Sequence, residues 1–147
     1  MSTITFESLN PKKYFLTPQE KINLQELAVR IEKVQAAYLA SSISAEPFTI
    51  TSGLRSQHDQ YSIYEQKAKA AGIPYDKSKV PMGSKHLIGC AADVGDAGLK
   101  ITAWLKDNPD VLEQSQLWCE DGNKNWVHFQ SRPFASYTSG GTRWFKP

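Results

Sequence analysis

The sequence is poor in cysteine, in long apolar runs and in net charge. Two cysteines in 147 residues are too few for the disulfide framework of a small secreted scaffold. No apolar run approaches the roughly 20 residues that span a bilayer, so we expect no membrane partner. The first seven residues lack the basic and apolar regions of a signal peptide, so we expect none.

The charge balance argues against a nucleic-acid partner. Seventeen basic and fifteen acidic residues leave a formal charge of +2, and the basic residues are scattered instead of forming a stripe. The length fits one domain, and the composition is that of a globular protein. We predict a single domain over residues 1–147, with a lead-in at 1–16, a core at 17–130 and an irregular tail at 131–147. No heptad pattern is present, so the sequence does not determine the oligomeric state.

Helical signals come early in the chain. Residues 17–20 have the layout of a capping box, and apolar residues then recur at helical spacing, which predicts a helix from Thr17 to about Ser41. A second helix is predicted between Ser56 as its N-cap and Gly72. Shorter helical segments are predicted at 98–105 and 110–114.

Strand signals are short and come mostly later. We predict strands at 48–53, 91–94, 117–120 and 126–129. Residues 121–125 have turn chemistry, so the last two strands should form a hairpin, and residues 73–83 should be a loop. This order of elements predicts an α+β fold with a small central antiparallel sheet flanked by helices.

One of only three histidines lies close to a carboxylate on a strand of small residues. Gly89 allows a tight turn after His86, and that turn brings the imidazole back over Asp93. Asp93 shares its strand face with Ala91, and a carboxylate among small apolar residues needs a cation or several hydrogen-bond donors. His86 and Asp93 are therefore candidate metal ligands.

The predicted hairpin supplies a third ligand. Alternation across a five-residue linker puts four side chains on one face, namely Trp118, Glu120, Trp126 and His128. Two histidines and one carboxylate are the ligand set of an open catalytic zinc site, which makes water more acidic and polarises a carbonyl. The unligated Glu120 would transfer the proton. The alternative is a structural role, with both histidines hydrogen-bonded and Asp93 acting as a cap or turn residue.

The segment Ser84-x-His86-x-x-Gly89-x-Ala91-x-Asp93, followed by Trp126-x-His128, resembles the signature of the zinc D-alanyl-D-alanine carboxypeptidases. That superfamily includes the L-alanyl-D-glutamate endopeptidases of bacteriophage endolysins. Residues 51–56 also resemble its Ser-Gly-aromatic-Arg-Ser segment, with Leu54 in the aromatic position. The resemblance covers about residues 48–130 and implies a zinc cleft on one face of the sheet.

The resemblance also implies roles for individual residues. One zinc ion is expected on three ligands, His86, Asp93 and His128. Arg55 matches the arginine that reaches the substrate carbonyl or carboxylate. Ser84 matches the motif serine, which orients a ligand or a substrate carboxylate, and Trp126 is expected to line the substrate cleft.

One position departs from the family pattern. Many members have the catalytic acid three residues before the last histidine, where this chain has Asn125. Glu120 and Asp121 are the remaining candidates, and alternation favours Glu120 because Asp121 should point away or sit in the turn. If neither reaches the metal, the chain could be a non-catalytic cell-wall-binding or virion structural domain that retains the fold.

The resemblance implies hydrolysis of an amide bond in the peptidoglycan stem peptide. L-Ala-D-Glu endopeptidase activity is expected, with D-Ala-D-Ala carboxypeptidase activity as the alternative. Glu120 would take the proton of the attacking water, while zinc and Arg55 stabilise the oxyanion. The expected absence of a signal peptide fits a phage lysin made in the host cytoplasm, which reaches the periplasm and cell wall after release.

Overall fold

Helix α1 (Pro18–Ala40) is the longest helix of the computed structural model, which describes residues 4–41 and 46–146. The first three residues of the expected lead-in and the last residue of the expected tail lie outside these ranges. The predicted capping box is confirmed. Thr17 Oγ1 accepts a hydrogen bond from the Glu20 amide at 3.1 Å, and Glu20 Oε1 accepts one from the Thr17 amide at 2.9 Å. Across the described ranges, no helix combines the length and apolar character needed to cross a membrane.

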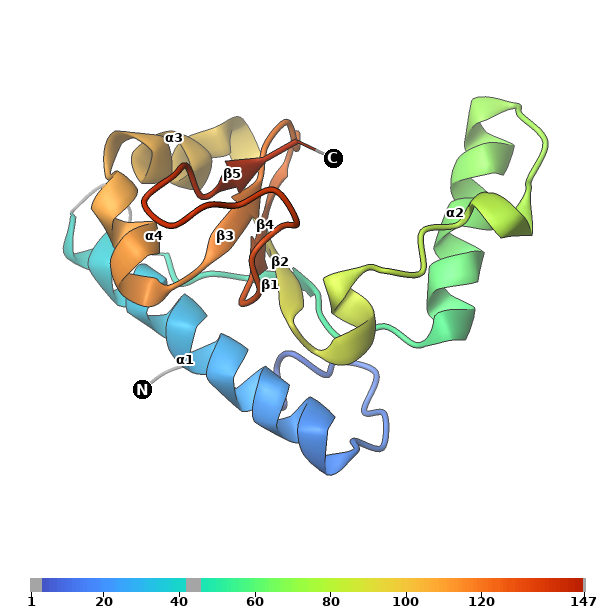
Figure 1. Cartoon of the computed structure of the whole chain (residues 1–147), viewed down its shortest axis with the longest axis horizontal. Coiled ribbons are helices and arrows are strands. Elements are labelled where there is room, and N and C mark those ends of the chain that lie inside the picture. Colours follow the sequence, from blue (N-terminus) through green and yellow to red (C-terminus); the bar gives the residue numbers. More distant parts are fainter. Residues whose placement is uncertain (1–3, 42–45, 147) are drawn as a thin grey trace.

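Five strands form one sheet in the order β1-β2-β4-β3-β5 (Figure 1). They are β1 (Ile50–Ser52), β2 (Ala91–Gly95), β3 (Trp118–Glu120), β4 (Trp126–Gln130) and β5 (Trp144–Phe145). The pairs β1–β2, β2–β4 and β4–β3 are antiparallel, whereas β3 and β5 are parallel. The α+β class is therefore confirmed, but the sheet is mixed instead of purely antiparallel.

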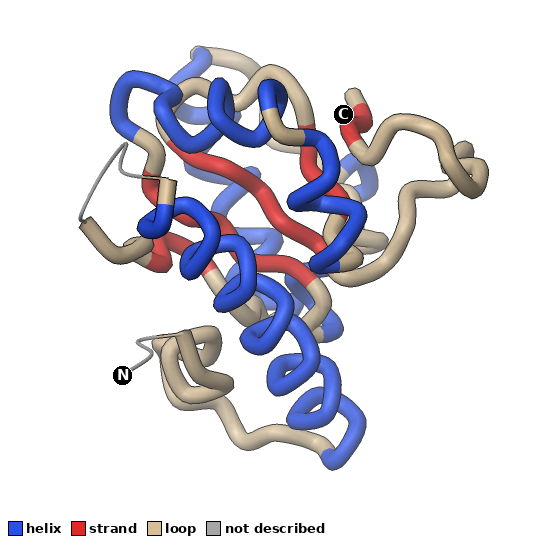
Figure 2. The backbone as a smooth tube through the Cα atoms, turned by 90° about the vertical axis from the view of Figure 1, so that its left-hand side faces the viewer, coloured by secondary structure: helices blue, strands red, loops and turns tan. Residues whose placement is uncertain are grey.

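Three helices cover one face of this sheet. Helix α1 packs there with α3 (Lys100–Asp107) and α4 (Pro109–Ser115), and Figure 2 shows these helices in front of the strands. The strands turn apolar side chains towards them, including the buried Ala92, Val94, Cys119, Val127 and Phe129. Alternation along the same strands leaves Asp93, Glu120 and His128 for the other face, as predicted.

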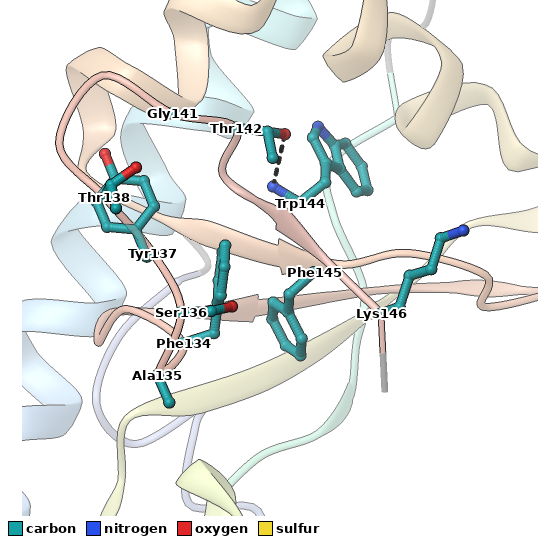
Figure 3. A pocket seen from close by; sticks show the side chains of 10 residues that line it. All are labelled: Phe134, Ala135, Ser136, Tyr137, Thr138, Gly141, Thr142, Trp144, Phe145 and Lys146. Atoms are coloured by element: carbon teal, nitrogen blue, oxygen red, sulfur yellow. Dashed lines mark hydrogen bonds between the residues drawn. The ribbon is translucent and has the colours of Figure 1, made fainter.

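The segment 131–146, expected to be irregular, contributes β5 to the edge of the sheet. The Cys119 amide donates to the Arg143 carbonyl at 2.9 Å, and the Asp121 amide donates to the Phe145 carbonyl at 2.7 Å. Trp144 and Phe145 project to opposite sides of the strand (Figure 3), and Trp144 packs against the core. A two-residue strand is too short to show an alternating pattern, so the sequence gives no signal for it.

Helix α2 (Gln57–Ala71) stands away from the sheet (Figure 1). Ser56 caps it and Gly72 ends it with a φ of +69°, both as predicted. The return segment, predicted to be a loop, contains the 3-10 helix η1 (Lys77–Lys79) and leads to η2 (Lys85–Ile88). We refer to residues 57–83 as the arm. The 1% exposed Gln60 donates through Nε2 to the Pro81 carbonyl at 2.8 Å, which joins the two limbs of the arm.

The predicted helix at 98–105 begins later than expected. Gly98 and Leu99 have φ angles of +74° and +58°, so the short η3 (Ala97–Leu99) is separated from α3 by a kink. The Asp96 carboxylate accepts hydrogen bonds from the amides of Ile101 at 2.8 Å and Thr102 at 2.9 Å. These bonds satisfy the first amides of α3 and place its start after the kink. The predicted turn at 110–114 is confirmed within α4.

Candidate metal centre

His86 lies in η2, which is bounded by Ser84 and Gly89. The Ser84 hydroxyl accepts a hydrogen bond from the His86 amide at 3.3 Å, and Gly89 ends the helix with a φ of +77°, a conformation that favours glycine. The imidazole is 2% exposed, and its Nδ1 lies 2.9 Å from the carbonyl oxygen of Gly53. Because that oxygen can only accept, Nδ1 is the donor of this contact, and Nε2 is the ring atom left to face Asp93.

Gly53 is fixed by the lead-in. Leu9 is fully buried, and its carbonyl oxygen accepts a hydrogen bond from the Leu54 amide at 2.8 Å. A Cβ added to Gly53 would lie 2.2 Å from that oxygen, so only glycine fits beside the lead-in. The lead-in therefore helps to position His86, because it fixes Gly53, whose carbonyl oxygen contacts His86 Nδ1.

Asp93 and His128 face each other across β2 and β4, where they are register partners. His128 Nδ1 lies 3.0 Å from Asp93 Oδ1, and His86 Nε2 lies 3.4 Å from the same oxygen. The other nitrogen of His128, Nε2, lies 2.9 Å from Gln130 Oε1. Gln130 donates through Nε2 to the Arg132 carbonyl at 2.8 Å, which keeps Oε1 turned towards the histidine. The Gln130 oxygen therefore holds Nε2 as a donor, which leaves Nδ1, now hydrogen-bonded to Asp93, as the atom that could bind a metal ion.

These three side chains form one buried group that can hold a metal ion. One ligand atom from each of His86, Asp93 and His128 lies within 4.8 Å of the others. Tetrahedral zinc ligands at 2.0–2.2 Å stand about 3.3–3.6 Å apart, close to the separations of 3.0 and 3.4 Å found here. With an ion bound, each imidazole would offer a lone pair on the side of Asp93, while its other nitrogen lies against an acceptor, as in oriented histidine ligands. The donor set therefore fits a divalent ion that takes nitrogen and oxygen ligands, zinc among them.

The charges of this group are arranged for a cation. Burial raises the pKa of Asp93, but the hydrogen bonds from His128 and His86 together outweigh it and hold the pKa below its usual value. Burial lowers the pKa of His128, but the hydrogen bond and charge of Asp93 together bring it above its usual value. An ionised carboxylate at a buried position needs positive charge or donors nearby, which Arg55 and the imidazoles supply here and which a metal ion would supply if it displaced imidazole protons.

The ligand group opens into a cleft of about 510 Å³ between the arm and the sheet. Besides the three ligands, the cleft is lined by predicted site residues, namely Arg55, Ser84, Glu120 and Trp126. Glu120 reaches it from β3, and its charge contributes to raising the pKa of His128. The structure therefore brings a carboxylate that is not in the ligand group to the same cleft.

Asp121, the alternative base, lies outside this lining. Its Oδ1 is 2.8 Å from Lys106 Nζ and accepts a hydrogen bond from the Gly122 amide at 2.9 Å. The Lys106 ammonium lowers the pKa of Asp121, which makes its carboxylate a weaker base.

Arg55 reaches the centre from the segment that leads into the arm. Its Nη2 lies 3.6 Å from Asp93 Oδ2 and donates to Ser52 Oγ at 3.1 Å, while Nη1 donates to Gln60 Oε1 at 3.3 Å. Its Nε is buried and has no hydrogen-bond partner among the described residues. Each Nη carries a second N–H besides the one in these hydrogen bonds, so the guanidinium is held at the cleft with donor capacity left for a ligand.

Several residues that line the cleft were not identified from the sequence, among them Gln60, Gln130, Phe134 and Phe145. The Phe145 ring meets the His128 ring edge-on at 6.0 Å, and Phe134 packs on Phe145 at 5.3 Å. The two phenylalanines also border a second hollow, of about 640 Å³, within the C-terminal segment (Figure 3). Only Gln130 had a usable signal, because it lies two residues after His128 on the same face of the strand.

The structure brings together most of the predicted site residues: His86, Asp93, His128, Arg55, Ser84, Glu120 and Trp126. It leaves Asp121 in an ion pair outside the cleft. No protein-family model, curated protein or solved structure matches the chain significantly.

Proposed function

We propose that the chain is a zinc-dependent peptidase that hydrolyses an amide bond in the peptidoglycan stem peptide, with the L-Ala-D-Glu bond as its target. One observation carries this proposal. The buried group of His86, Asp93 and His128 opens into a cleft that also holds the carboxylate of Glu120. The stem peptide as substrate is inferred from the resemblance of these segments to the carboxypeptidase signature.

The residues around the ligand group divide the chemistry between them. Zinc bound there would supply a Lewis acid that polarises the scissile carbonyl and makes water more acidic. Glu120 accepts the proton of the attacking water and delivers it to the departing amine, because its carboxylate faces the cleft. Arg55 turns the remaining N–H groups of its Nη atoms to the oxyanion that develops on the carbonyl oxygen.

The charges of the cleft favour an anionic peptide. Lys67 lines it from the arm, Lys85 from η2, and Arg55 from the residues just before the arm. The carboxylates of its lining are Asp93, which is turned to the ligand group, and Glu120, which comes from β3. A substrate with a free carboxylate beside the scissile bond, such as the D-Glu residue of the stem peptide, matches this arrangement.

Product analysis on defined muropeptides tests the proposal. Zinc-loaded protein should release new D-Glu amino termini, and chelated protein should release none. Release of free D-Ala would instead assign D-Ala-D-Ala carboxypeptidase activity. If no product forms, the peptidase proposal fails, and co-sedimentation with purified cell walls then tests the wall-binding alternative.

A pair of adjacent carboxylates tests the proposed base. E120Q should lower kcat by about 100-fold or more, because the amide takes no proton at neutral pH. D121N is the matched control, since Asp121 lies outside the cleft, and it should keep kcat near that of the wild type. Full activity of E120Q would contradict the role assigned to Glu120.

A further inference from the structure

The turn between β3 and β4 places an amide side chain between two residues of the cleft. Asn123 lies beside the carboxylate of Glu120 and the indole of Trp126. In the amide orientation that satisfies both neighbours, its nitrogen donates to Glu120 Oε1 at 2.9 Å and its oxygen accepts from Trp126 Nε1 at 3.3 Å. Gly122, with a φ of +91°, makes the tight turn just before it.

The two neighbours leave the amide only this orientation. An indole N–H can only donate, and an ionised carboxylate can only accept. The opposite orientation would set the Asn123 oxygen against the Glu120 oxygen, and its nitrogen against the Trp126 nitrogen. Trp126 therefore selects the amide orientation in which Asn123 donates to Glu120.

A neutral donor suits the role proposed for Glu120. The neighbouring Asp121 is held by the Lys106 ammonium, which lowers its pKa. The Asn123 amide instead fixes one oxygen of Glu120 without placing a full positive charge beside it. The second carboxylate oxygen stays available for the water proton.

We propose that Asn123 is a positioning residue for Glu120 and that Trp126 orients its amide. The consequence for catalysis rests on the peptidase function proposed above. Asn125, at the position where the resembled enzymes carry their acid, serves the backbone instead, since its carbonyl accepts a hydrogen bond from the Asp96 amide at 2.8 Å. Its exposed side chain makes N125A a matched control in the same turn.

The hydrogen bonds are tested by NMR on ¹⁵N-labelled, zinc-loaded protein. The indole resonance of Trp126 is assigned by its loss in W126F. N123A should shift that resonance, because the indole loses its acceptor, whereas N125A should leave it in place. N123D, which keeps the side-chain size and an acceptor but removes the donor, should retain the indole contact and release Glu120.

Kinetics on the same variants test the positioning role. N123A and N123D should lower kcat for muropeptide hydrolysis about tenfold, with KM within about twofold of the wild type, because substrate binding is untouched. N125A should match the wild type in both constants. An unshifted indole in N123A, or an active N123A enzyme with unchanged kcat, overturns the assignment. If the wild-type protein cleaves no muropeptide but the Trp126 indole resonance still shifts in N123A, the Trp126–Asn123 contact is supported. Only the peptidase function is then overturned.

Discussion

Replacing Gly53 by alanine should weaken both the fold and the metal centre. The new Cβ would lie 2.2 Å from the Leu9 carbonyl oxygen and 2.8 Å from the carbonyl carbon, and these backbone atoms cannot rotate away. Relief requires the lead-in to separate from Gly53, which breaks the 2.8 Å hydrogen bond from the Leu54 amide to Leu9. Overpacking costs about 1–3 kcal/mol and a lost hydrogen bond about 1 kcal/mol, so the free energy of unfolding should fall by about 2–4 kcal/mol.

The same displacement moves the Gly53 carbonyl away from His86 Nδ1, which now lies 2.9 Å from it. Losing the partner behind a histidine ligand lowers metal affinity by about 10–100-fold, and we expect a loss in that range for zinc. Urea unfolding of the chelated protein measures the stability, and competition with a chromophoric chelator measures the affinity.

Gly83 provides the matched control, because a Cβ added there meets nothing within 4 Å. G83A should therefore stay within about 1 kcal/mol of the wild type and keep its zinc affinity. If G53A behaves like G83A in both measurements, the lead-in does not position His86.

Three further predictions concern charged residues. Asp93→Asn should reduce bound zinc from about one ion per chain to a trace in elemental analysis after gel filtration, since the central anionic ligand is lost. Burial raises the pKa of Asp59, but its hydrogen bonds, foremost the one from Lys12, lower the pKa to about 2 from 3.8. The ionised Asp59 carboxylate therefore contributes fully to stability above pH 3.8, and this contribution is lost as the pH falls through 2. Circular dichroism of Asp59→Asn should therefore show about 1 kcal/mol less stability at neutral pH, after allowance for solvent screening, and no difference below pH 2. The double variant Lys67→Gln, Lys85→Gln should lower kcat/KM about tenfold for a free D-Glu carboxylate and leave an amidated substrate unchanged, and an equal loss on both substrates would contradict electrostatic recognition.

Local signals predicted the elements that carry the ligands. The caps at Thr17 and Ser56 are made within three residues of each helix start, so they can be recognised without knowledge of the rest of the chain. Strand alternation assigned Glu120 and His128 to one face, and the register that pairs Trp118 with Gln130 preserves that assignment. The Gly89 of the His86 motif predicted the tight turn after His86, which places this histidine beside Asp93.

Contacts between segments that are distant in the sequence could not be predicted from local patterns. The fit of Gly53 against Leu9 depends on how the lead-in packs, which no local pattern encodes. The same holds for Gln60, whose partner is Pro81 in the return limb of the arm. Phe145 enters the cleft only because β5 pairs with β3, and two residues are too few to indicate that pairing.

The burial of both thiols has a consequence for how the protein can be handled. Cys90 and Cys119 are 0% exposed, and neither lines the cleft. Burial raises the pKa of the Cys119 thiol well above its usual value, so little thiolate is available to bind copper(I) or to react with peroxide. Soft metal ions and oxidants therefore find little cysteine sulfur to react with. Zinc loading can be measured in air, without a reducing agent that would itself chelate the metal.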